Sequence, residues 1–210
     1  MRTVGGTLAI AICACVLVWS HPLGAQSIRG RELLGLRIGG AIASGAFDNE
    51  FGSGSEIDIH FIHGITDRIG VDVSVSSHNF GESIHAEKNI EFFDRPNMNL
   101  QIFSVSVGVI ALRPVHGRFT ATFEAGPGLY SVNAILPYGF YEAQKTDNRL
   151  GLYAGAGVLI RLADSVSLNV NAKLHNVFVG TSSEDTVHFY TGDSQARFFQ
   201  IAFGIMISSG

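Results

Sequence analysis

Residues 150–178 read LGLYAGAGVLIRLADSVSLNVNAKLHNVF, and this stretch decides the fold. Every second residue is apolar from Leu152 to Ile160, and the same period returns from Val166 to Leu174. Between the two runs, Ala163-Asp164-Ser165 has the composition of a tight turn. Successive side chains of a β-strand point to opposite faces, whereas those of a helix repeat every 3.6 residues. The stretch therefore predicts two antiparallel strands joined by a short turn.

Six further segments carry the same two-residue period. They lie at residues 34–39, 56–61, 69–76, 103–109, 119–126 and 199–207. No apolar run after residue 25 approaches the length of a membrane-spanning helix. If the chain enters a membrane, it must therefore do so as a closed barrel, because unpaired backbone amides are too costly in hydrocarbon.

The predicted connections alternate in length. Short turns are expected at residues 64–68, 114–117 and 163–165, and longer polar links at 46–55, 79–98, 133–148 and 180–196. Outer-membrane barrels have this layout, with short periplasmic turns and longer extracellular loops. The prediction for residues 26–210 is an all-β fold, an eight-stranded antiparallel up-and-down transmembrane β-barrel with both termini on the periplasmic side.

The N-terminus has the features of an export signal. Arg2 precedes an apolar run from Leu8 to Val18, and Pro22 precedes a small-residue exit that ends at Ala25. We expect residues 1–25 to be a signal peptide cleaved after Ala25. A helical membrane anchor would need about 20 apolar residues, more than this run has. A lipoprotein signal with Cys15 as the lipidated residue is a further alternative.

Composition excludes several classes of site. Charged residues make up 15% of the chain and the formal charge is only −4, without the clustered basic face of a nucleic-acid-binding protein. Both cysteines, Cys13 and Cys15, lie inside the expected signal. The mature chain would therefore have no disulfide and no cysteine ligand for a metal. No cofactor is predicted.

Alternation alone does not say which face of the strands is inside. A soluble lipocalin-like barrel turns its apolar face inward around a ligand, whereas a membrane barrel turns it outward to lipid. The export signal and the last alternating segment favour the membrane orientation. The soluble carrier stays as an alternative.

Three stretches resemble a known family. Residues 124–130 (EAGPGLY), residues 150–178 and the run from Phe199 to Ile207 are similar to strands of the small outer-membrane β-barrel family of the OmpA and OmpX type. This family usually ends on an aromatic residue, whereas the present chain continues through Ser208-Ser209-Gly210. The resemblance implies the barrel fold and the outer membrane. Its members include anchors, adhesins, defence proteins, small pores and a few lipid-modifying enzymes, so it implies little about activity.

The last alternating run also implies partners. Its outward side chains resemble the signal read by the barrel-assembly machinery, and they are Phe199, Ile201, Phe203, Ile205 and Ile207. The other expected partner is outer-membrane lipid. The chain is expected to be a monomer and to bind no nucleic acid.

The histidines and serines do not form a recognisable catalytic or metal motif. His60 and His63 are three residues apart on one predicted strand, so they face opposite ways. His78 and His85 flank a long polar link with Glu82 and Glu87, where a chance metal site is less expected than a solvated loop. A lipid hydrolase would need a serine within reach of a histidine. His175 has none two residues on, and Ser182 and Ser183 fall in the following link. The chain is therefore predicted not to be an enzyme.

One group of charged residues could have a functional role, because it lies on the polar face of the predicted strands. Its members are Arg37, Asp58, Asp72, Glu124, Arg161 and Lys173, with Glu56 as a further candidate. The lumen of an eight-stranded barrel is only wide enough for side chains to fill. We expect these residues to form a salt-bridge network that plugs the lumen and stabilises the barrel. The alternative is a gate that opens a narrow pore when pairs exchange.

Aromatic residues gather near the ends of the strands that face the long links. They are Phe47, Phe51, Phe80, Tyr130, Tyr138, Phe140, Tyr141, Phe178, Phe189 and Tyr190. They are expected to form an interfacial girdle, with packing among the loops as the alternative. The predicted function is a structural or surface-interaction role in the outer membrane. A narrow pore or a binding barrel for a small or apolar solute is the main alternative, and a lipid-modifying hydrolase comes last.

Overall fold

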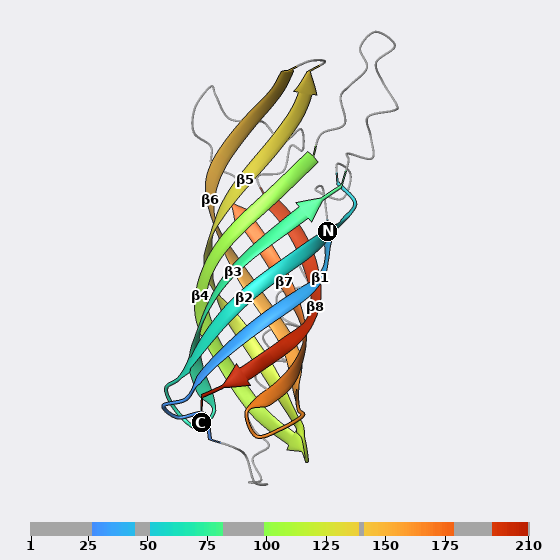
Figure 1. The fold of residues 1–210 in the computed structure, drawn as a ribbon. Helices are drawn as coiled ribbons and strands as arrows, with labels where there is room; N and C mark the ends of the chain where they lie inside the picture. The colour runs from blue at the N-terminus through green and yellow to red at the C-terminus, as the bar shows by residue number, and fades with distance from the viewer. Residues whose placement is uncertain (1–26, 45–50, 82–98, 139–140, 179–194, 210) are drawn as a thin grey trace, which may run out of the picture.

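The computed structural model describes residues 27–44, 51–81, 99–138, 141–178 and 195–209. The described part contains eight strands: β1 (Glu32–Ser44), β2 (Ser53–Gly64), β3 (Ile69–Phe80), β4 (Asn99–His116), β5 (Phe119–Tyr138), β6 (Tyr141–Arg161), β7 (Val166–Phe178) and β8 (Gln195–Ser208). Each strand pairs antiparallel with its neighbours in the sequence, and β1 also pairs with β8, so the sheet is a closed up-and-down barrel (Figure 1). The predicted fold class is confirmed. No helix in these residues is long and apolar enough to cross a membrane.

The strands place their apolar side chains outside and their polar ones inside. On β1, Leu34 and Leu36 are exposed, whereas Gly35 and Arg37, which alternate with them, face the lumen. Arg37 is only 2% exposed. Glycine is needed at position 35 because the ring of His60, its register partner on the adjacent strand β2, occupies the place that a Cβ atom would take. The orientation is therefore that of a membrane barrel and not that of the soluble carrier.

The two ends of the barrel differ. The three tight connections, residues 65–68, 117–118 and 162–165, lie at one end together with Glu32 and Ser208, and we name this the turn end. The opposite end, which carries the longer links, is the loop end. One backbone bond and one backbone–side-chain bond close the barrel at the turn end: Ser209 N donates to the Glu32 carbonyl at 2.8 Å, and Glu32 N donates to Ser209 Oγ at 3.0 Å. Ser208 and Ser209 thus take part in closing the barrel.

One predicted loop was wrong. Residues 133–148 are mostly paired strand, because the β5–β6 register continues from Leu129↔Leu150 to Tyr138↔Tyr141. A side-chain bond from Thr146 Oγ1 to Asn133 Oδ1 at 2.5 Å joins the two strands across this extension. Beyond the apolar region the strands keep their backbone pairing but no longer need apolar residues at every second position. The pattern that marks a strand is therefore lost there, although the strand continues.

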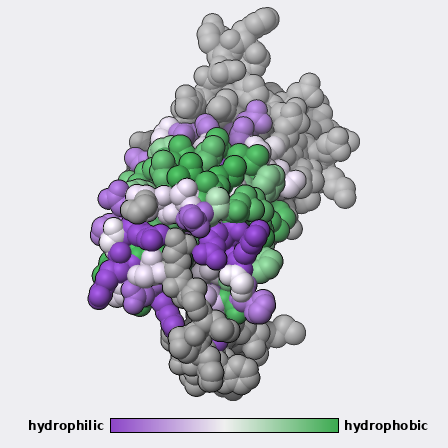
Figure 2. Space-filling view, turned by 60° about the horizontal axis from the view of Figure 1, so that its bottom comes forward, coloured by the Kyte–Doolittle hydropathy of each residue, from purple (hydrophilic) through white to green (hydrophobic). Residues whose placement is uncertain are grey.

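The outward apolar residues form a belt around the barrel. Polar residues on the same face mark its edges. Toward the loop end they are Ser44, Ser55, Ser77, Gln101, Ser131, Asn148 and Arg197, and toward the turn end Glu32, His63 and Arg113. Figure 2 shows the hydrophobic band (green) giving way to hydrophilic residues (purple) toward the turn end. The strands place from three outward residues (β2) to six (β5) in this belt, which suits a hydrocarbon layer crossed by tilted strands.

Two apolar clusters fill the ends of the lumen. The upper cluster, toward the loop end, consists of Ala41, Ala43, Phe51, Phe80, Leu100, Ile102, Tyr130, Val132, Val177, Ala196 and Phe198. The lower cluster, toward the turn end, consists of Ile28, Leu33, Ile62, Ile110, Leu112, Leu159 and Met206. Between them the inward side chains are mainly polar or charged.

The aromatic girdle was predicted wrongly for three of its members. Phe51, Phe80 and Tyr130 are buried in the upper cluster of the lumen. Phe80 and Tyr130 occupy inward positions of β3 and β5, and Phe51 lies just before β2. Phe178 is on the outside, 39% exposed. Tyr138 and Tyr141 pair at the tip of the β5–β6 hairpin. Phe47, Phe140, Phe189 and Tyr190 lie outside the described residues, as do the expected signal peptide, His85 and Ser182–Ser183.

Candidate functional site: a charged layer in the barrel lumen

Arg37 and Asp58 form the best-defined ion pair of the lumen. The two residues are direct partners in the β1–β2 register. Arg37 donates to Asp58 Oδ1 from Nε at 3.0 Å and from Nη2 at 2.8 Å. Both side chains are 2% exposed. Since neither has water to solvate it, each charge depends on the other for its stability.

Glu124 connects opposite walls of the barrel. Its Oε1 lies 3.5 Å from Arg37 Nη1 on β1, and its Oε2 lies 3.1 Å from Lys173 Nζ on β7. Asn171, also on β7, donates its side-chain amide to Glu124 Oε1. Glu124 itself is on β5, so the two ion pairs cross the lumen in different directions. This carboxylate holds three strands together through side chains alone.

Asp72 joins the layer through Tyr153. The phenol of Tyr153 on β6 donates to Asp72 Oδ2 at 3.4 Å. Lys173 Nζ lies 5.1 Å from the centroid of the Tyr153 ring, within the range of a cation–π contact. Asp72 and Lys173 are therefore linked through one aromatic side chain.

Glu56 is buried in the same layer without a polar contact. It is 5% exposed, and neither carboxylate oxygen has a hydrogen-bond partner among the described residues. Among the residues that the structure describes, the layer contains four buried carboxylates, Glu56, Asp58, Asp72 and Glu124, but only two buried cations, Arg37 and Lys173. The sequence pattern predicts six lumen residues, with Glu56 as a further candidate. The structure places all of them in this layer except Arg161.

Arg161 is not part of this layer. It lies at the last position of β6, is exposed, and lines a cavity at the turn end with Arg118 and Asp164. Arg161 has the predicted parity on β6, but it lies closer to the turn end than the charged layer does. Leu159 of the lower cluster, on the same face two residues earlier, already closes the lumen at this height.

A group of histidines and serines beside the charged layer was missed. His78, predicted at the start of a long link, lies within β3 and is fully buried. Its Nε2 is 3.2 Å from Ser76 Oγ, and the hydroxyls of Ser76 and Ser104 share a hydrogen bond of 2.7 Å. The signal was present, because His78 continues the inward series that contains Asp72 and Ser76.

His175 organises the layer toward the upper cluster. Its Nδ1 is 3.0 Å from the Tyr130 hydroxyl, and its Nε2 is 2.7 Å from Gln200 Oε1. Its ring stacks on Phe198 at a centroid distance of 4.5 Å. This histidine is therefore held on both nitrogens and on one face.

The geometry does not complete a catalytic site within the described residues. A nucleophile needs a base that is itself oriented by a third group. His78 could act as a base for Ser76, but its Nδ1 has no hydrogen-bond partner among the described residues. The pair is also enclosed, with Phe198 packed edge-on against His78 at 4.8 Å. Nor do the described residues contain a group of three or more histidine, cysteine or carboxylate side chains placed to hold a metal.

Solved structures share this architecture. The structure of Neisserial surface protein A aligns with 85% of this chain and 96% of its own, with a TM-score of 0.56 and 14% identity. The outer membrane protein OprG from Pseudomonas aeruginosa aligns with 88% and 98%, with a TM-score of 0.58 and 10% identity.

The chain has the fold of the small outer-membrane β-barrels. Ail, the attachment invasion locus protein of Yersinia pestis, is a further outer-membrane barrel neighbour, with a TM-score of 0.52, 11% identity and coverage of 86% and 99%. No family model matches the sequence. No curated protein matches it either. At identities of 10–14%, the property that this chain shares with these structures is the fold.

Proposed function

We propose that this chain is an outer-membrane β-barrel whose lumen is closed, and that it acts as a membrane-embedded scaffold without catalytic activity. The observation that carries the proposal is the layered lumen. A charged layer lies between two apolar clusters, and this arrangement supports a lumen that is blocked at three successive heights. Insertion by the barrel-assembly machinery through Phe199, Ile201, Phe203, Ile205 and Ile207, contact with outer-membrane lipid and a monomeric state belong to the same proposal.

The two kinds of layer block the lumen in different ways. The apolar clusters exclude water, and an ion that entered them would lose its hydration without gaining a partner. The charged layer links opposite walls, because Glu124 contacts Arg37 and Lys173 on different strands. To open a path, these pairs would have to separate within a low-dielectric interior, which is unfavourable.

Planar-bilayer recordings test the closed lumen. We expect the purified barrel to show no steady conductance. Replacing two ring-contacting residues of the upper cluster, Phe80→Ala with Phe198→Ala, should increase the frequency of openings, because their rings meet inside the lumen with centroids 5.4 Å apart. Phe103→Ala on the outward face of β4 is the matched control and should leave the trace unchanged. A steady opening of the unaltered protein would contradict the closed lumen and favour the narrow-pore alternative.

A surface role is favoured by the extension at the loop end. The pairing of β6 with β7 runs from Arg161 at the turn end to Gly151 toward the loop end. Residues 141–150 of β6 therefore pair only with β5 among the described strands. Figure 1 shows β5 and β6 rising beyond β1, β2, β3, β7 and β8. We propose that this hairpin is presented outside the cell, where it can contact a partner.

Epitope insertion tests that orientation. A tag placed between residues 139 and 140 should be labelled by antibody on intact cells. The same tag in the Gly117–Arg118 turn should be labelled only after the outer membrane is permeabilised. Both insertions lie in connections between strands, so the barrel should tolerate them. Labelling of the turn on intact cells would mean that the barrel is inserted the other way round.

A further inference from the structure

A cavity opens at the turn end of the lumen. Its volume is about 90 Å³, so it can hold a few waters or one small polar group. Its apolar floor consists of Leu33, Leu112, Leu159 and Met206, all members of the lower cluster. The cavity is therefore separated from the charged layer by the lower cluster and opens away from it.

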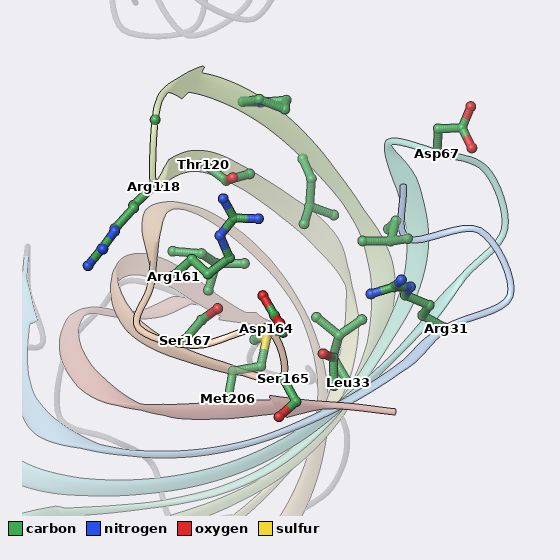
Figure 3. A pocket seen from close by; sticks show the side chains of 16 residues that line it. Arg31, Leu33, Asp67, Arg118, Thr120, Arg161, Asp164, Ser165, Ser167 and Met206 are labelled. Carbon is green, nitrogen blue, oxygen red and sulfur yellow. The ribbon is translucent and has the colours of Figure 1, made fainter. Parts of the chain in front are cut away.

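The wall of the cavity carries three arginines, two aspartates (Asp67 and Asp164) and several hydroxyl groups. Arg31, Arg118 and Arg161 line it together with Thr120, Ser165, Ser167 and Ser208. Figure 3 shows Arg31 and Arg161 reaching toward the opening from opposite sides, whereas Arg118 points away from it. In the described part of the chain, no side-chain hydrogen bond or ion pair involves Arg31 or Arg161.

Local structure places both guanidinium groups. Arg31 follows a turn in which Gly30 has φ 69°, and its carbonyl accepts a bond of 3.0 Å from Gly64 N. Gly64 has no side chain that would collide with the Ile28 carbonyl, so the segment before β1 can lie against β2. On the other side, Arg161 N donates to the Arg118 carbonyl at 2.9 Å. The two arginines are thus carried by backbone that is anchored to the barrel.

Positive charge prevails at this end. Its described residues include six arginines, Arg29, Arg31, Arg68, Arg113, Arg118 and Arg161, against three carboxylates, Glu32, Asp67 and Asp164. Asp67 accepts a bond of 2.6 Å from Ser27 and points away from the opening (Figure 3). Asp164 lies between Arg31 and Arg161 and is the carboxylate that an anion in the cavity would meet.

We propose that this cavity binds a phosphate group, held between the guanidinium groups of Arg31 and Arg161. Planar guanidinium forks match the oxygens of a phosphate, and charge-assisted bonds of this type are among the strongest hydrogen bonds in proteins. The hydroxyls of Thr120, Ser165 and Ser167 supply further donors. The apolar floor keeps water from one side and so strengthens the attraction between the charges. The small volume admits one phosphate group, whether free or at the end of a larger molecule.

Titration with inorganic phosphate tests the site. The folded barrel in a zwitterionic detergent is titrated with sodium phosphate by calorimetry, against sodium chloride of equal ionic strength. Arg161→Gln should weaken phosphate binding about tenfold, the loss of one charge-assisted contact. Arg68→Gln, which removes an arginine of the same rim that does not line the cavity, should change it less than about twofold. Equal weakening by both variants, or no difference between phosphate and chloride, would overturn the proposal.

A second variant and a comparison of two lipid compositions complete the test. If Arg161→Gln fails to fold, as judged by loss of the folded band on a gel, Arg31→Gln carries the same expectation. The source of the phosphate group is then examined in nanodiscs of phosphatidylcholine with or without phosphatidylglycerol. Weaker binding of inorganic phosphate with the anionic lipid indicates that a lipid headgroup occupies the cavity. Unchanged binding indicates a soluble phosphate compound. Absence of phosphate binding in both discs, when the same barrel binds phosphate in detergent, indicates that the phosphatidylcholine headgroup also occupies the cavity.

Discussion

At the scale of single residues, the lumen depends on charges that cannot be removed one at a time. Arg37 and Asp58 are both 2% exposed, and each compensates the other's loss of hydration. Glu124 lies 3.5 Å from Arg37 and so shares in this compensation. Removal of one member leaves a buried charge with fewer partners, which lowers the stability of the fold. Removal of both members of a pair leaves no such uncompensated charge.

A double-mutant cycle on Arg37 and Asp58 should show this coupling. Arg37→Gln alone is expected to destabilise the folded barrel by about 3–5 kcal/mol, as for one partner of a buried pair. The combination with Asp58→Asn should cost less than the sum of the single changes by at least about 1 kcal/mol. The measurement is the urea dependence of the folded band on a cold gel. Additive effects would mean that the pair contributes no interaction of its own.

At the scale of elements, each strand is divided along its length into a lipid-facing part and a part beyond it. β4 shows both on one face, because Val107 lies at mid-belt and Val115 lies beyond Arg113 near the turn end. Both valines point outward and are exposed, 47% and 60% respectively. In water the two positions would be equivalent. In a membrane they differ, since only the first faces hydrocarbon.

An arginine placed at each of these valines measures the belt directly. Val107→Arg should destabilise the barrel in phospholipid vesicles by about 2–4 kcal/mol, and Val115→Arg by about 0–1 kcal/mol. The free energies come from reversible unfolding in guanidinium chloride. The two variants have the same substitution on the same strand, and they differ in depth and in the irregular β4–β5 register between Pro114 and His116, where Val115 lies. Similar costs at the two positions would contradict the assignment of the belt.

At the scale of the whole molecule, closure is what makes the strands stable together. β1 and β8 are paired from Leu33↔Ser208 to Ser44↔Arg197, so neither is an edge strand. The bonds of Ser209 with Glu32 extend the closure by one residue. Closure therefore leaves neither β1 nor β8 as an edge strand with unpaired backbone in the membrane.

Closure should be visible as heat-modifiable migration. Protein extracted from an outer-membrane fraction should run differently on a detergent gel before and after boiling, because the closed barrel resists the detergent when cold. Deletion of residues 208–210 should lower the temperature of this shift, since it removes the bonds between Glu32 and Ser209. Recovery in the soluble periplasm without any shift would be incompatible with a membrane barrel.

The sequence by itself determined the strands, their faces and the short turns. These properties are local: alternation follows from the geometry of a single strand, and the turn residues act within a few positions. Parity therefore assigned Arg37, Asp58, Asp72, Glu124 and Lys173 to one common face, and the export signal together with the last alternating segment indicated that this face is the lumen. The same parity places His78 on the lumen side of β3, although the length of the polar link predicts that it lies where the link begins.

Only the tertiary structure decided which inward residues meet. Strands in a barrel are tilted and staggered, so that position along the sequence does not give height in the lumen. Arg161 has the right parity but lies at the turn end, where the lower cluster separates it from Arg37 and Glu124. The β5–β6 hairpin also depends on pairing, because its strands continue where no hydrocarbon requires an apolar face. Contacts across the lumen are set by closure and register, which arise only when all eight strands assemble.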